Sequence, residues 1–124
     1  MRMNNNRILS IAETIRQQLV GMTPMNILMS WGISKIVATV IDDMAALKLY
    51  VNGRLHKGTV IIALNEGTDY YEVYLRDKAG NTNKIAGDID FTQLGDTIDE
   101  AIERGKDKAE YDKFCEEQRR LLFL

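Results

Sequence analysis

The sequence has few of the residues from which catalytic and metal sites are built. One histidine, His56, and one cysteine, Cys115, occur among its 124 residues. A single histidine excludes a multi-histidine metal site within one chain, and a single cysteine excludes an internal disulfide. No apolar run approaches the roughly 20 residues that a membrane-spanning helix requires. These shortages argue against a histidine-rich metalloenzyme, a disulfide-stabilised scaffold and a membrane partner.

Other enzyme signatures are missing as well. The serines lie in no nucleophile-elbow sequence, and neither a phosphate-binding loop nor a dinucleotide fingerprint occurs. Asp88 and Asp90 offer two carboxylates to Mg²⁺, but an EF-hand requires further ligands and a central glycine. A strand end and a helix cap explain these two aspartates more simply. We therefore predict a protein that is not an enzyme, with no catalytic residue, no metal and no cofactor.

Composition and length are those of an ordinary globular domain. Hydrophobic residues make up 45% of the chain and charged residues 27%, close to the average. A net charge of −2 gives no overall attraction to nucleic acid or anionic lipid, and residues 1–7 lack the apolar core of a secretory signal. We expect one α+β domain over residues 1–124 in the cytoplasm of a bacterial host cell, with 106–124 as a helical tail and candidate interaction segment.

Two helices are predicted at the amino-terminal end. Apolar residues recur at helical spacing over 5–21. Thr23 and Pro24 then form an N-cap and first-turn pair for a short helix over 25–31. This second helix is apolar nearly all round, which indicates either burial or a surface that awaits a partner. For Trp31 itself, core packing is favoured over a binding groove.

The carboxy-terminal third is predicted to be helical. Asp90 and Gln93 have the spacing of a capping box, and an apolar stripe follows from Leu94. Gly105 interrupts the pattern, which resumes more weakly over 106–124. The chain ends on four apolar residues, although frayed termini are normally polar. Those residues are therefore expected either to dock on the domain or to meet another chain.

Alternation of apolar and polar residues between the helices predicts five strands. Asn, Asp and Gly clusters separate the strands, and no connection is long enough for a crossover helix, so neighbours should pair antiparallel. The predicted fold is α+β, an antiparallel β-meander of about five strands with N-terminal helices and a C-terminal helix packed on one face. The strands are expected at 34–41, 46–51, 58–64, 70–76 and 84–89.

Residue parity divides the predicted sheet into two faces. The apolar face is expected to be the core beneath the helices: Leu47, Leu49, Val51, Val60, Ile62, Leu64, Tyr71, Val73 and Leu75. The opposite face is mixed and unusually aromatic. Because no RNA-binding sequence accompanies its tyrosines, a dimer contact or cross-strand pairing is favoured over base stacking. The candidate partner surface combines this face with the tail: Tyr50, Ile61, Tyr70, Tyr74, Leu121, Leu122 and Phe123.

Alternating strand direction also sorts the charged turns into two poles. The acidic pole gathers Asp42, Asp43, Glu66, Asp69, Asp88 and Asp90. The basic pole gathers Lys35, Arg54, His56, Lys57, Arg76, Lys78 and Lys84. Glycine-bearing turns with several cations can hold a phosphate or a nucleic-acid backbone, so these seven residues form a candidate phosphate site. The simpler alternative is that charged residues commonly occupy turns.

Several short motifs resemble small uncharacterised proteins of Bacteroidales phages, prophages and mobile elements. They are Met29-Ser30-Trp31-Gly32, Leu49-Tyr50-Val51-Asn52-Gly53, His56-Lys57-Gly58-Thr59-Val60 and the segment 64–71. The resemblance extends over residues 7–103 and does not include the tail. It implies a phage or an integrated element in a gut-type bacterium as the setting, and it brings no activity and no catalytic residues.

Two classes of function agree with these patterns. The leading hypothesis is a non-enzymatic interaction protein that binds another macromolecule or itself, for which a phage setting suggests inhibition of a host-defence component. The alternative is a small nucleic-acid- or nucleotide-binding protein that uses the basic pole of the sheet. A protein partner or self-association is expected in the first case and a polyanion in the second.

Overall fold

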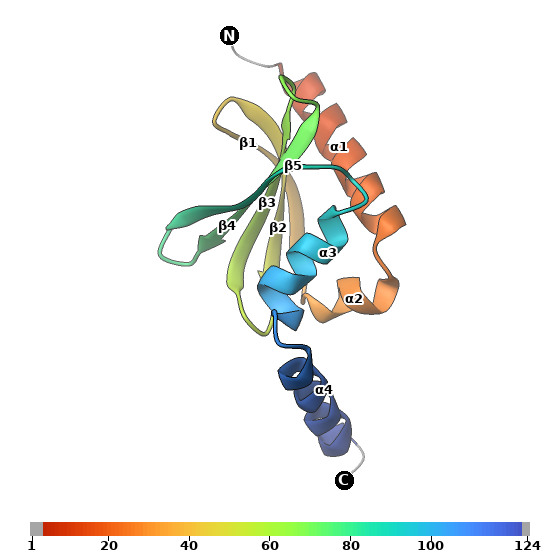
Figure 1. Cartoon of the computed structure of the whole chain (residues 1–124). Helices are drawn as coiled ribbons and strands as arrows, with labels where there is room; N and C mark the ends of the chain where they lie inside the picture. Colours follow the sequence, from red (N-terminus) through yellow and green to blue (C-terminus); the bar gives the residue numbers. More distant parts are fainter. Residues whose placement is uncertain (1–3, 123–124) are drawn as a thin grey trace.

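In the computed structural model, which describes residues 4–122, the chain folds into a five-stranded antiparallel sheet with helices on one of its faces (Figure 1). The strand order is β1-β2-β3-β4-β5, so the predicted α+β meander is confirmed. The strands are β1 Lys35–Ile41, β2 Met44–Asn52, β3 Lys57–Asn65, β4 Tyr70–Asp77 and β5 Thr82–Ile89. The helices are α1 Asn5–Met22, α2 Met25–Ser30, α3 Leu94–Asp99, the π-helical turn η1 Glu100–Arg104 and α4 Lys108–Leu122.

Strand pairing follows from the turns and from the apolar alternation. Between β1 and β2 only two residues intervene, Asp42 and Asp43, with φ of 48° and 62°. Two consecutive positive φ values are typical of the tight hairpin turn whose twist matches that of the strands. In the centre of the sheet, Leu49 pairs with Val60 and Ile62 with Val73. This register keeps the apolar set on one face, because a slip by one residue would reverse every side chain.

The main core lies between this apolar face and the helices. Leu49, Val60, Ile62 and Val73 are completely buried, which confirms the predicted inner face. The helices contribute their own apolar stripes: Ala12, Ile15 and Leu19 from α1, and Leu94, Ile98 and Ile102 from α3 and η1. Trp31, directly after α2, is fully buried in the same cluster, as expected for a core tryptophan.

The opposite face is less open than parity alone suggests. Ile61 and Tyr74 are buried there, in a second small cluster with Ala46 and Ala63. The hairpin ends of β1–β2 and β4–β5 project from the sheet on the side away from the helices (Figure 1), and residues near the β1–β2 turn pack against this cluster. Ile61 and Tyr74 therefore lie outside any accessible partner surface, whereas Tyr70 remains exposed.

Two helix caps differ from the prediction. Thr23 makes no side-chain capping bond to α2; it is instead the buried C-cap of α1, where its hydroxyl lies against Gly95. Asp90 and Gln93 form one half of the expected capping box, since the backbone N–H of Asp90 donates to the Gln93 side chain at 3.0 Å, while the Asp90 carboxylate accepts the backbone N–H of Thr92 at 2.8 Å. These contacts close a turn before the helix, and α3 begins only at Leu94.

Helix α4 projects from the rest of the protein (Figure 1). None of its residues is buried, and the side chains of Leu121 and Leu122 are 68% and 80% exposed. Of the two outcomes expected for the apolar end, docking on the chain's own domain does not occur for these two residues. Phe123 and Leu124 lie outside the described residues. Within 4–122, no helix combines the length and apolarity that crossing a membrane requires.

Truncation of Ile62 should be strongly destabilising, because Ile62 is completely buried at the centre of β3. We expect Ile62→Ala to lower the free energy of unfolding by about 2–5 kcal/mol. Ile36→Ala is the matched control, since Ile36 lies on β1 and is 40% exposed; its cost should stay below about 1 kcal/mol. Urea denaturation measures both, and equal losses would contradict the assignment of the core face.

Candidate functional site

A groove of about 560 Å³ lies over the basic end of the open sheet face. Its walls come from β2, β3, β4 and the β4–β5 turn, which the meander brings side by side. The lining is predominantly basic and polar: Ser34, Lys48, Tyr50, Asn52, Lys57, Gly58, Thr59, Arg76, Asp77, Lys78 and Gly80, with Val51. The groove thus collects part of the predicted basic pole together with residues of the open face.

One cross-strand row forms the basis of the groove. Lys35 pairs with Tyr50, Tyr50 with Thr59, and Thr59 with Arg76. Arg76 in turn pairs with Thr82 on β5, to whose hydroxyl its Nε donates at 2.8 Å. Directly opposed residues on neighbouring strands have Cβ atoms about 4.5–5.5 Å apart. The pairing therefore places two cations, one aromatic ring and two hydroxyls in a single line across the sheet.

The cations that line the groove, and Lys35 beside it, form no ion pair within residues 4–122. The lining cations are Lys48, Lys57, Arg76 and Lys78. The ammonium groups of Lys35 and Lys48 instead lie 5.6 and 5.3 Å from the centre of the Tyr50 ring. Cation–π contacts are compatible with a further anionic partner, because they leave the charge of the ammonium uncompensated.

Thr59 adds an unsatisfied polar atom to the groove. Its side chain is buried, with 8% of its surface exposed, and its hydroxyl oxygen has no hydrogen-bond partner. Buried hydroxyls are normally hydrogen-bonded, since leaving one unpaired costs about 1–3 kcal/mol. Because the oxygen is covered, a ligand in the groove would give this hydroxyl a partner only after the Thr59 side chain rotates outward.

Backbone close packing holds β3 and β4 together beneath the groove. A Cβ at Gly58 would overlap the carbonyl oxygen of Arg76, so the close approach of the two strands requires glycine at this position. Asp77, the acidic residue of the lining, accepts hydrogen bonds from the backbone and side-chain nitrogens of Asn81 at 2.9 and 3.1 Å. These bonds lower the pKa of the Asp77 carboxyl. They also link the two ends of the β4–β5 turn.

Three residues of the predicted basic pole lie elsewhere. The His56 ring is within 3.2 Å of the Thr59 carbonyl and does not line the groove. Lys84 pairs with the buried carboxylate of Glu72 in the middle of the open face. The Arg54 guanidinium binds the carbonyl oxygens of Glu103 and Arg104, both at 2.9 Å. Of the predicted basic pole, Lys57, Arg76 and Lys78 therefore line the groove and Lys35 lies beside it over the Tyr50 ring, whereas Arg54, His56 and Lys84 are left out.

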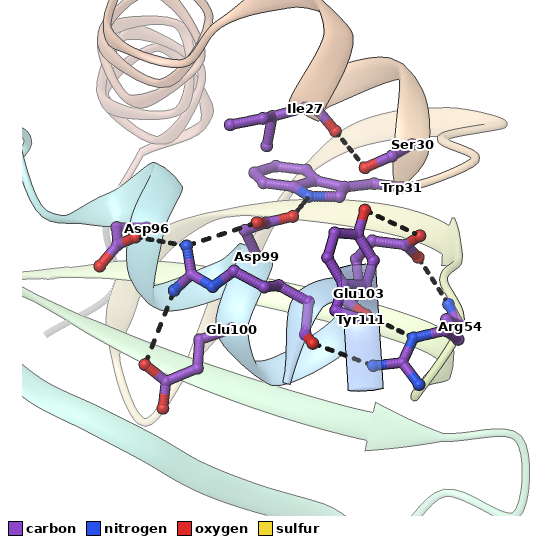
Figure 2. A network of polar contacts seen from close by, with 10 residues as sticks. Ile27, Ser30, Trp31, Arg54, Asp96, Asp99, Glu100, Glu103 and Tyr111 are labelled. Carbon is purple, nitrogen blue, oxygen red and sulfur yellow. Dashed lines mark hydrogen bonds and ion pairs between the residues drawn. The ribbon is translucent and has the colours of Figure 1, made fainter. Parts of the chain in front are cut away.

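Arg54 belongs to a polar network on the helical side of the sheet (Figure 2). The buried Glu103 carboxylate accepts the backbone N–H of Arg54 at 2.7 Å. A second buried carboxylate, Asp99, accepts the indole N–H of Trp31 at 2.9 Å and lies 3.6 Å from the Arg104 guanidinium. Arg104 also binds Asp96 at 2.8 Å, and this pairing raises the pKa of its guanidinium.

This network has the properties of a structural element. Its carboxylates are already satisfied by N–H donors and guanidinium groups, as buried charges require. In the described residues no cluster of three or more His, Cys, Asp or Glu side chains is arranged to hold a metal. The network joins the β2–β3 turn to η1 and α4, and it therefore fixes the position of the helices.

Comparisons with known protein families, curated proteins and solved structures found no significant match. The resemblance to phage and mobile-element proteins stays a prediction, and function has to be inferred from geometry. Sequence reasoning missed Lys48 and Thr59 as groove residues, because it searched the turns for cations and left the strand interiors out. The signal was available: the parity of Lys48, Tyr50 and Thr59 already placed them on the open face.

The Glu72–Lys84 pair predicts a pH-dependent contribution to stability. Hydrogen bonding to Lys84 lowers the pKa of Glu72 from its ordinary value of 4.5. A lowered folded-state pKa stabilises the fold above the unfolded value, and this gain is lost as the pH falls through the folded value. Glu72→Gln should therefore lower the melting temperature near neutral pH, and the deficit should shrink well below pH 4.5. A deficit that is independent of pH would contradict the role of the charge.

Proposed function

We propose that the protein is a non-enzymatic binding protein for a phosphate-bearing polymer, a single-stranded nucleic acid whose backbone lies in the basic groove. One observation carries the proposal: four cations that form no ion pair within residues 4–122 line a groove that Thr59 also lines, and Lys35 lies beside it over the Tyr50 ring. Single-strand binding sites combine a positive groove that follows the backbone with aromatic side chains. Tyr50 supplies the aromatic ring in the middle of the row.

The dimensions of the site favour a chain of phosphates over a single phosphate. The row from Lys35 to Thr82 crosses all five strands, which at about 4.8 Å per strand spacing extends for about 19 Å. One phosphate group can contact only a part of such a row. The groove volume of about 560 Å³ lies in the range of about 300–1,000 Å³ that is typical of ligand sites.

The charge distribution supports a directional mode of binding. The chain carries a net charge of −2, and the acidic turns lie at the other end of the strands from the basic groove. A polyanion is therefore attracted to one end of the sheet and repelled from the other. The carboxylate of the lining, Asp77, accepts hydrogen bonds from Asn81 in the β4–β5 turn, and the proposed activity is binding without turnover.

A second candidate function is the binding of a macromolecular partner through exposed apolar side chains. Met25 and Met29 on α2 are 64% and 74% exposed, and Leu121 and Leu122 at the end of α4 are exposed as well. Exposed apolar groups of this size on helices are a common feature of interaction surfaces. The resemblance to phage and mobile-element proteins suggests a host-defence component as this partner. Only the resemblance supports that choice of partner.

Fluorescence anisotropy with a labelled oligothymidylate tests the first function. We expect binding at low salt that weakens with rising salt concentration, because each phosphate contact releases counterions. The triple variant Lys48→Ala/Lys57→Ala/Lys78→Ala should weaken binding by at least about tenfold and reduce the slope of log K against log salt by about two. Thr59→Val, which removes the hydroxyl at similar volume, should weaken binding without lowering the melting temperature.

The matched control removes the same charge away from the groove. Lys106→Ala/Lys108→Ala/Lys113→Ala alters three lysines that do not line it, and we expect its affinity to stay within about threefold of the unmodified protein. No binding at low salt would sink the proposal. An equal loss of affinity in both triple variants would also contradict the proposal, because it would show that the oligonucleotide is attracted by overall charge and not by the groove.

A further inference from the structure

Helix α4 has an apolar stripe that the described residues cover only in part. Phe114 and Cys115 follow Tyr111 by three and four residues, and Leu122 follows Cys115 by seven. These spacings place the four side chains along one side of a helix. Helices of soluble proteins normally bury such a stripe. In α4 the first three side chains are only partly covered, and Leu122 is 80% exposed.

The direction of α4 is set by contacts at its base. The Arg54 guanidinium lies 5.4 Å from the ring centre of Tyr111 and 5.3 Å from that of Phe114. It also pairs with Glu110 at 3.1 Å, and Figure 2 shows Arg54 and Tyr111 joined to Glu103. Only these first turns are held in this way, and the distal half extends away from the sheet (Figure 1).

A groove of about 660 Å³ lies at the base of α4, between α2, η1 and α4. Ile27, Tyr111 and Cys115 form an apolar strip within it. The rest of the lining is Gly105 and eight polar or charged residues: Asn26, Ser30, Asp99, Glu100, Arg104, Lys106, Lys108 and Asp112. The chain's own Leu122 cannot fill it, since eleven residues of helix separate Leu122 from Tyr111, a distance of about 16 Å along the axis. A leucine of α4 that meets the apolar strip of this groove would therefore belong to another molecule.

The charges beside the stripe indicate which molecule that is. Asp112 and Arg119 lie on the same flank of the helix, seven residues apart, and within 4–122 neither forms an ion pair. If two copies of α4 pack antiparallel and cross near Cys115, each Asp112 faces Arg119 of the other copy. Two complementary pairs then form at once, because a two-fold interface repeats every contact.

We propose that α4 is a homodimerisation helix: two copies pack antiparallel, and Leu122 of each lies against the apolar strip of the α2–η1–α4 groove of the other. This inference rests on the second candidate function, for which it names the partner as a second copy of the chain. In a pair of copies, Leu122 of one chain meets the groove of the other, and Asp112 of one chain meets Arg119 of the other. The basic groove lies on the other face of the sheet and stays accessible in this arrangement.

Charge reversal in the full-length chain tests the antiparallel packing. We expect a dimer by sedimentation equilibrium, and a tenfold or greater weakening of dimerisation in Asp112→Arg and in Arg119→Asp, since each change places like charges together twice. The double variant Asp112→Arg/Arg119→Asp should regain an affinity within about threefold of the unmodified protein. Leu122→Asp should be monomeric, with an unchanged circular dichroism spectrum because this side chain is exposed.

A covalent probe gives an independent readout. A short bis-maleimide should join two chains through Cys115, the single cysteine of the sequence, which lies at the proposed crossing point. Leu122→Asp should abolish the product. A monomer at the highest soluble concentration would overturn the proposal, as would a dimer that the double variant fails to restore. Oligonucleotide affinity separates the two proposals, because loss of the dimer should leave binding in the basic groove intact.

Discussion

The antiparallel register of β2, β3 and β4 is the constraint on which the rest of the structure depends. It aligns Leu49 with Val60 and Ile62 with Val73 on the inner face, where α1 and α3 complete the core. The same register aligns Tyr50, Thr59 and Arg76 on the outer face. Since side chains alternate along a strand, one set of backbone hydrogen bonds determines both the hydrophobic core and the basic groove.

The sequence predicts the elements well because their signals are local. Apolar alternation and turn residues locate five strands, and the fully buried Leu49 and Ile62 agree with the predicted face. The site is less predictable, because it depends on which cations already have partners. Arg54 looks like any turn cation, yet its bonds to Glu103 and Arg104 link residues about fifty positions apart. Likewise, the burial of Ile61 and Tyr74 depends on how the sheet bends, which parity does not describe.

The polar network beside η1 explains how the carboxy-terminal helices are oriented. The backbone N–H of Leu55 donates to the Ile102 carbonyl at 2.8 Å, and Arg54 binds the two carbonyls that follow. Gly105 donates to Glu100 at 3.0 Å in an i→i+5 bond, the hydrogen bond of a π-turn. Carbonyls at the end of a helix lack intrahelical partners, and here a guanidinium from the β2–β3 turn supplies them. The sheet and α4 are therefore connected through side chains as well as through the chain itself.

The position of Trp31 gives this protein an intrinsic optical reporter. It is the one tryptophan in the sequence, its indole is completely enclosed, and its N–H is bonded to the Asp99 carboxylate. Its emission therefore originates from a dry environment at the junction of α2, α3 and the sheet. Loosening of that junction admits solvent to the ring and shifts the emission maximum to longer wavelength. The integrity of the helical layer can therefore be followed without a label.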